Sequence, residues 1–277
     1  MKRIVLSIVL LCALHLGNAQ QLVLPAPSPA QTVKQDFGLS YIELSYSRPA
    51  VRERKVFGDL VPYNKVWRTG ANGATTLTFG DEVSIGGKRI PAGKYGLLSI
   101  PGEKEWVLII TKQTNVTSPA AYKQEEDVVR VVAKPQTLAN KVENFTIQFE
   151  NIQPESCELQ IIWDKTMVVL PIKTHIDAKV MAAIDASMKS DKPAYFQAAT
   201  YYFESGKDLN KAIDWFAKAA EQQPNAFWIK YQYARALAKA GKKDEAAKVA
   251  LQSKELAAQA KNDDYVKLNE KLLASLK

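Results

Sequence analysis

The sequence predicts an all-β sandwich domain followed by an all-α helical region, and three observations support this division. Short runs of alternating apolar and polar residues, separated by turn residues, fill the chain between residues 36 and 174. From Asp177 onward alanine and lysine dominate and β-branched residues become scarce, which favours helices. Ala246 follows Ala212 by 34 residues, a period typical of repeated helical hairpins.

The first residues have the pattern of a secretory signal peptide, which we predict over residues 1–19. A short basic start precedes an apolar run from Ile4 to Leu16, and small residues lead to the expected cleavage after Ala19. This run is shorter than the roughly 20 apolar residues that span a bilayer, which disfavours a membrane anchor. A lipoprotein signal at Cys12 is disfavoured because leucines occupy the positions before it. We therefore expect an exported protein, periplasmic or secreted, without an integral membrane segment after cleavage.

The charge and the scarcity of cysteine and histidine exclude several classes of site. Loss of Lys2 and Arg3 with the signal peptide lowers the net charge from +8 to +6, and this charge is spread along the chain, so we expect no nucleic-acid partner. Cys157 and His175 are then the single remaining cysteine and histidine. An intrachain disulfide, a two-histidine zinc site and a cysteine metal cluster are therefore excluded, and we expect no metal and no cofactor.

Neither of these two residues is expected to be catalytic. Cys157 lies in an apolar run, where a free cysteine usually packs as a small hydrophobic residue. His175, with Asp177 two residues later, could form a base and its orienting acid. No Gly-x-Ser-x-Gly motif supplies a nucleophile, however, so we interpret His175 as an exposed or hinge histidine.

The β domain is predicted over residues 36–174, after an extended linker over residues 20–35. Three prolines at alternate positions favour a polyproline-like tether for that linker, with a docking strand as the alternative. The alternation and turn signals then predict strands over residues 39–47, 75–79, 83–85, 88–90, 95–100, 105–111, 128–133, 142–150, 157–163 and 167–173. Residues 164–166 are predicted to be the turn between the last two strands.

The densest group of specific signals lies between Tyr63 and Pro101, and it includes three of the four candidate ligand-binding residues. The four candidates are Arg48, Trp67, Arg68 and Asn72. A planar guanidinium beside an aromatic ring suits a carboxylate or phosphate ligand. The structural alternative is that Arg68 and Asn72 bond to backbone carbonyl groups and fix the loop, and that the tryptophans belong to the core.

Carboxylates offer a weaker alternative for catalysis. Asp81 and Glu82 form one acidic pair, and Glu125, Glu126 and Asp127 form another group. Two-carboxylate hydrolysis requires two such groups facing each other across a cleft. We interpret these residues as solvated turn residues.

The helical region is predicted over residues 175–277, with helices over residues 177–190, 193–205, 209–222, 226–240, 243–261 and 264–276. Ala212, Phe216, Ala219 and Pro224 fit the second helix of a tetratricopeptide unit. The next unit departs from this pattern, because Ala250 replaces the aromatic residue and no proline follows. The region therefore resembles a degenerate tetratricopeptide-like array with a capping helix. A plain helical bundle is the alternative.

Several motifs of the β domain resemble the DUF2911 family. They are Tyr46-Ser47-Arg48-Pro49, Val66-Trp67-Arg68-Thr69-Gly70-Ala71-Asn72, Ala92-Gly93-Lys94-Tyr95 and Trp106, with Ile162-Trp163 near the end. The resemblance covers roughly residues 24–173. It implies an exported protein of the Bacteroidetes type, and it supplies no catalytic residues because the function of the family is not established.

These observations lead to one principal hypothesis and two alternatives. The principal hypothesis is a non-catalytic binding protein of the cell envelope. Its β domain would bind a small anionic or carbohydrate ligand or act as a scaffold, and its helical region would bind an envelope protein. One alternative is a carboxylate-dependent hydrolase acting on an envelope carbohydrate or ester with the help of Arg68. The other is a purely structural envelope protein.

Overall fold

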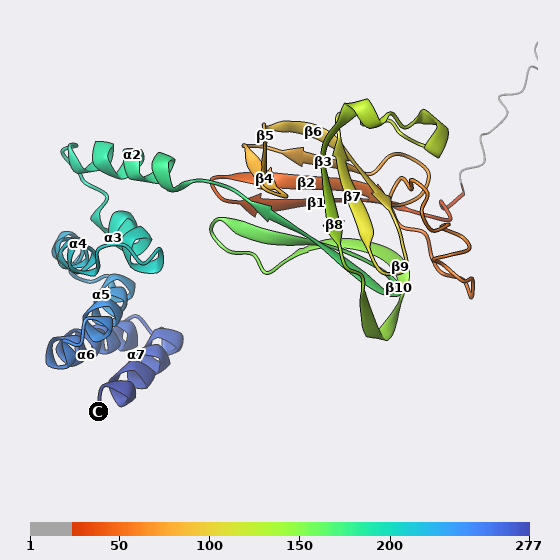
Figure 1. Cartoon of the computed structure of the whole chain (residues 1–277). Helices are drawn as coiled ribbons and strands as arrows, with labels where there is room; N and C mark the ends of the chain where they lie inside the picture. Colours follow the sequence, from red (N-terminus) through yellow and green to blue (C-terminus); the bar gives the residue numbers. More distant parts are fainter. Residues whose placement is uncertain (1–23) are drawn as a thin grey trace, which may run out of the picture. The chain divides into compact units, whose positions relative to one another are not determined.

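The computed structural model describes residues 24–277, so the predicted signal peptide and the first residues of the linker lie outside the described part. The chain forms two compact units, one ending at Ile176 and the other beginning at Asp177. The first unit consists of strands and the second of helices (Figure 1). The predicted order of an all-β domain followed by an all-α region is therefore confirmed.

The larger sheet of the β unit has six antiparallel strands among the described residues, in the order β1-β2-β3-β6-β7-β8. Every neighbouring pair is antiparallel. The strands span Ala30–Phe37 (β1), Ser40–Ser47 (β2), Thr76–Phe79 (β3), Gly93–Ile100 (β6), Trp106–Thr111 (β7) and Asp127–Ala133 (β8). Two short 3₁₀ helices, Pro119–Ala121 (η2) and Gln124–Glu126 (η3), lie between β7 and β8.

The smaller sheet has four antiparallel strands in the described part, in the order β5-β4-β10-β9. Its strands span Val83–Ile85 (β4), Lys88–Ile90 (β5), Gln136–Glu150 (β9) and Ser156–Lys173 (β10). The Gly86-Gly87 turn joins β4 and β5, and both glycines have positive φ, as a tight hairpin requires.

The hydrophobic core lies between the two sheets, which makes the β unit a sandwich. Alternate residues of β2, such as Ile42 and Leu44, are fully buried, and so are Leu159 and Leu170 of β10. All four belong to one cluster of packed apolar side chains. Alternation along each strand thus sends one set of side chains into the shared core and the other outward.

Strand β1 replaces part of the predicted linker. Residues 30–37 pair in register with β2, so the extended tether predicted over residues 20–35 ends before Ala30. The strand has little apolar alternation because it is an edge strand whose residues are mostly exposed or half-buried. Ahead of it, the carbonyl oxygen of Pro29 accepts a hydrogen bond from the Arg48 amide at 2.9 Å. This contact holds Pro29 beside the end of β2.

Strand β10 is continuous, so the prediction of two strands joined by a turn at residues 164–166 is wrong. Asp164 has a positive φ of 52°, and the register with β9 shifts on both sides of it. The residues that favour a turn are therefore accommodated as a bulge within a single strand. A bulge keeps the chain in the sheet while bending it.

The second unit contains six α-helices. They span Asp177–Met188 (α2), Tyr195–Glu204 (α3), Leu209–Gln222 (α4), Phe227–Lys239 (α5), Lys243–Gln259 (α6) and Asp263–Leu276 (α7). The motif positions Ala212, Phe216 and Ala219 are fully buried in α4, as are Ala246 and Ala250 in α6. Small buried residues allow neighbouring helices to approach closely. Among residues 24–277, no helix has the length and apolar character needed to cross a membrane.

Candidate functional site

The Trp67–Asn72 turn lies over a cluster of aromatic side chains that fills one part of the sandwich core. The Trp67 ring stacks on Trp163, with ring centroids 6.0 Å apart, and meets Phe145 edge-on at 5.1 Å. Phe57 packs edge-on against Trp106 at 4.9 Å. Such aromatic contacts add to the stabilisation that burial alone provides. Trp67 is thus part of the core cluster, as well as part of the turn.

Hydrogen bonds within the turn fix its shape. The indole Nε1–H of Trp67 donates to the Gly70 carbonyl oxygen at 3.1 Å, and the Thr75 hydroxyl donates to the Thr69 carbonyl oxygen at 2.7 Å. Thr69 and Asn72 have positive φ values of 54° and 55°. Asparagine adopts this conformation more readily than most residues, whereas threonine does so at a cost in strain. The turn is therefore held in shape by its own contacts.

Because the segment around Trp67 pairs with β6, the side chains of Trp67 and Arg68 lie on opposite sides of this segment. Trp67 and Ser99 exchange two backbone hydrogen bonds, at 2.7 and 3.0 Å, so the residues around Trp67 follow the edge of β6. Trp67 packs against the main core, whereas Val66 belongs to a smaller cluster with Leu98 and Ile109. Since neighbouring side chains of an extended segment alternate, Arg68 lies on the same outer side as Val66.

Arg68 is anchored by one of its three nitrogen atoms. Its Nη1 donates to the carbonyl oxygen of Asn72 at 3.3 Å and to that of Thr117. Nε and Nη2 donate to no residue in the described part of the chain. These two nitrogens form the edge of a guanidinium that binds a carboxylate through two parallel hydrogen bonds. The side chain is therefore oriented, and its Nε–Nη2 edge has no hydrogen-bond partner among residues 24–277.

A cavity of about 540 Å³ lies beside this arginine, and we call it the Arg68 cavity. Its volume is within the range of about 300–1,000 Å³ typical of small-molecule sites. Trp67 lines it together with apolar residues from three segments, which are Leu60, Val61, Pro62, Val66, Ile100 and Pro119. Its polar lining consists of Asn64, Lys65, Arg68, Thr117 and Ser118. Two cations and no carboxylate therefore line this cavity.

Arg48 and Asn72, the other two predicted ligand-binding residues, do not line the Arg68 cavity. Arg48 donates to the Phe145 carbonyl oxygen at 3.1 Å, to the Gln31 side chain at 3.0 Å and to the Thr146 hydroxyl at 2.8 Å. The Asn72 amide donates to the Ser28 carbonyl oxygen at 3.0 Å. The structure thus separates the four residues into a pair at the cavity and a pair that holds segments of the β unit together.

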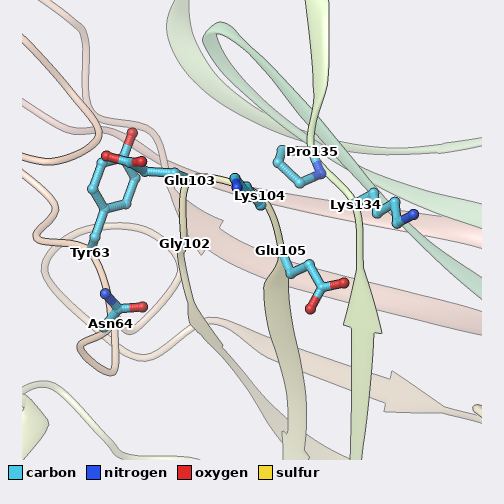
Figure 2. A pocket seen from close by; sticks show the side chains of 8 residues that line it. All are labelled: Tyr63, Asn64, Gly102, Glu103, Lys104, Glu105, Lys134 and Pro135. Carbon is cyan, nitrogen blue, oxygen red and sulfur yellow. The ribbon is translucent and has the colours of Figure 1, made fainter.

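A second cavity, of about 790 Å³, adjoins the same loop, and we call it the Tyr63 cavity (Figure 2). Its lining comes from the loop of Tyr63 and Asn64, from the turn at residues 102–105 and from Lys134 and Pro135. Asn64 lines both cavities. Sequence reasoning missed Tyr63 and Asn64 because they form no motif and face a turn that is distant in the sequence.

Two carboxylates line the Tyr63 cavity, and among residues 24–277 none lines the Arg68 cavity. Glu103 and Glu105 line the Tyr63 cavity, where both are exposed. Figure 2 shows their side chains leaving the turn in different directions. The hydrolase alternative requires two carboxylates facing each other across a cavity that also holds Arg68.

Cys157 and His175 lie away from both cavities. Cys157 is 2% exposed, and burial raises the pKa of its thiol to about 12. The thiol is therefore protonated at neutral pH and is a poor nucleophile. His175 is exposed after the end of β10.

Comparison with known proteins agrees with the motifs around this site. A family of proteins of unknown function, DUF2911, matches residues 28–172, which include Arg68 and the residues that line both cavities. No curated protein and no solved structure matches the chain. The match covers more than half of the 277 residues. The chain therefore belongs to the DUF2911 family.

Proposed function

We propose that this is an exported, non-catalytic binding protein of the cell envelope, whose β unit binds a small amphipathic anion in the Arg68 cavity. One observation carries the proposal. Arg68 is anchored through Nη1 to two backbone carbonyl oxygens beside an apolar cavity, and its Nε–Nη2 edge remains for a ligand.

The charge of the lining supports an anionic ligand. Lys65 and Arg68 are both cationic, and none of the lining residues is acidic. An arginine that is already oriented loses less side-chain freedom when it binds, and its edge matches the geometry of a carboxylate. Lysine offers a point charge without this geometry, so we assign the directional contact to Arg68 and the supporting charge to Lys65.

The remaining lining supports an apolar body. Leu60, Val66, Ile100 and Pro119 offer apolar surface from three separate segments. Burying aliphatic groups there contributes roughly 25 cal/mol per Å² of apolar area removed from water. A simple inorganic anion would leave this surface unfilled. The favoured ligand therefore has a carboxylate and an aliphatic chain.

Calorimetric titration of the full-length protein with nonanoate tests the proposal. We expect nonanoate to bind and nonanol, which lacks the charge, to bind at least about tenfold more weakly. Arg68→Gln should lose most of the affinity for nonanoate. Arg89→Gln is the matched control, because Arg89 is an exposed arginine on β5 outside the cavity.

The comparison of these ligands also separates binding from a purely structural role. Nonanoate and nonanol are compared on the unchanged protein, so the result does not depend on how Arg68→Gln folds. Equal affinity for the two, or no binding of nonanoate, would contradict the proposal. Reduced stability of Arg68→Gln without any nonanoate binding by the unchanged protein would favour the structural alternative.

For the helical unit, we propose a tetratricopeptide-like array that binds an envelope protein. The buried small residues at the motif positions of α4 and α6 support the repeat, and exposed apolar side chains such as Trp228 and Leu268 support a binding role. Cross-linking in cells, followed by purification, tests this role. A partner recovered with the unchanged protein should be lost with Trp228→Ala and kept with Lys230→Ala.

Export can be tested independently of binding. The protein should occur in the envelope or the medium after cell fractionation, and its mature mass should correspond to a chain that begins at Gln20. A cytoplasmic protein that retains residues 1–19 would contradict this part of the proposal.

A further inference from the structure

The two cavities differ in chemistry, although both border the loop of Tyr63 and Asn64. The Arg68 cavity is apolar and cationic, as described above. The Tyr63 cavity has two carboxylates, Glu103 and Glu105, and two ammonium groups, Lys104 and Lys134, so its charges balance. A cavity with balanced charges and several hydrogen-bonding groups suits a neutral, hydroxyl-rich group better than an ion.

Asn64 lines both cavities. Its backbone amide donates to the Pro101 carbonyl oxygen at 2.8 Å, which places this residue against the turn that lines the Tyr63 cavity. Its side-chain amide makes no hydrogen bond within residues 24–277. An amide offers both donors and an acceptor to a ligand. Asn64 can therefore contact a ligand that extends from one cavity into the other.

The separation between Asn64 and Arg68 fits a short aliphatic chain. Four residues span at most about 14 Å when fully extended. The side chain of Val66 lies between them in sequence, and it lines the Arg68 cavity with Ile100. Apolar lining therefore lies between the guanidinium and Asn64, over a separation that an extended nonanoate chain can span.

Tyr63 provides an aromatic surface in the second cavity. A side-chain carbon at Gly58 would lie 2.7 Å from the Tyr63 ring, so only glycine allows this ring to pack against the neighbouring backbone. Tyr63 and Glu103 both line a small recess together with Trp106. An aromatic ring next to a carboxylate can pack against the apolar face of a sugar while the carboxylate accepts hydrogen bonds from its hydroxyl groups.

We propose that the ligand is a sugar-bearing fatty acid, with its carboxylate on Arg68, its aliphatic chain in the Arg68 cavity and a neutral sugar in the Tyr63 cavity. This inference rests on the proposed function, since it extends the ligand of the Arg68 cavity beyond its carboxylate and chain. The two cavities then form one binding site, with Asn64 at the junction.

The test compares nonanoate with a carboxyoctyl β-glucoside, which is nonanoate carrying glucose at the end away from its carboxylate. Calorimetric titration of the full-length protein should show the glucoside binding at least about tenfold more tightly. Glu103→Ala should remove this advantage, so that the variant binds the glucoside and nonanoate with similar affinities. Glu150→Ala, an exposed glutamate at the end of β9 outside both cavities, is the matched control and should preserve it.

The possible outcomes distinguish this inference from the proposed function. If nonanoate does not bind, the proposed function fails and this inference fails with it. If nonanoate binds but the glucoside binds no more tightly, the proposed function stands and the sugar site is overturned. An advantage of the glucoside that survives Glu103→Ala would also overturn the assignment of the sugar to the Tyr63 cavity.

Discussion

Arg48, at the end of β2, donates its Nε–H to the carbonyl oxygen of Phe145 in β9 at 3.1 Å, and so connects the two sheets. Its two other nitrogens donate to Gln31 and Thr146, on β1 and β9 respectively. One half-buried guanidinium thus connects three strands.

We expect Arg48→Met to destabilise the β unit without affecting nonanoate binding. The substitution leaves the Phe145 carbonyl oxygen without this charged donor, and the expected loss is about 2 kcal/mol in the free energy of unfolding. Urea denaturation measures it. Arg89→Met should change stability by less than about 0.5 kcal/mol, because Arg89 is exposed and its ion pair with Glu82 is on the surface. If Arg48→Met bound nonanoate more weakly while its stability stayed the same, the result would instead support a ligand role for this arginine.

The aromatic cluster should depend strongly on Phe57. This ring packs edge-on against Trp67, Trp106 and Trp163, with centroids 6.2, 4.9 and 6.3 Å away. Phe57→Ala removes these contacts and should cost about 3 kcal/mol. Phe57→Leu, which keeps most of the volume, should cost clearly less. Denaturation monitored by tryptophan fluorescence measures the free energy of unfolding of both variants. Equal losses of stability would show that the cluster does not depend on the volume of the side chain at position 57.

The Cys157 thiol should resist modification in the folded protein. Burial raises its pKa to about 12, so little reactive thiolate forms at pH 8, and the side chain is only 2% exposed. In a protein that also carries Cys12→Ser, Ellman's reagent should react only as the β unit unfolds. A Cys157→Ala variant with Lys165→Cys, at an exposed position of the same strand, should react at once. Rapid reaction of Cys157 under native conditions would contradict the buried placement.

Glu143 should make the free energy of unfolding of the β unit depend on pH. The backbone amide of Arg52 donates to its carboxylate at 2.8 Å, and this hydrogen bond lowers the pKa of Glu143 below its usual value of 4.5. Because the folded-state pKa is the lower one, the stabilisation is present above pH 4.5 and is lost as the pH falls through the lowered pKa.

Glu143→Gln removes this contribution and allows it to be measured. The variant should be less stable than the unchanged protein at pH 7, and the difference should shrink below pH 4.5. Glu150→Gln, on the same strand and exposed, is the matched control and should show no such trend. A constant difference across this pH range would rule out the carboxylate as its source.

The strands that could be predicted from the sequence are those with apolar alternation. Ile42, Leu44 and Tyr46 marked β2 because one face of that strand is buried. Strand β1 lacks this signal, since its pairing with β2 depends on backbone hydrogen bonds and on the turn after Phe37. The bulge at Asp164 has the composition of a turn, and only the register with β9 shows that the strand continues.

The candidate site was predictable only in part, for a related reason. The aromatic–arginine pair of Trp67 and Arg68 is visible in the sequence because its chemistry is local. The partners that give Arg68 its orientation are backbone carbonyl groups, and one of them, Thr117, lies 49 residues away. Backbone carbonyls carry no sequence signature. Asn64 likewise acquires its position only when its loop meets the turn after β6.

The pairing of β4 with β10 restricts when the smaller sheet can form. Ile85 pairs with Ile172, and Ser84 with Lys173, so the β4–β5 hairpin is synthesised 87 residues before its partner. Contacts this distant in sequence form slowly, and unpaired strand edges are prone to aggregation in the meantime. In a chain that is synthesised from its N-terminus, β4 cannot pair with β10 until β10 has been synthesised. The helices that follow β10 are synthesised only after the last strand of the sandwich is complete.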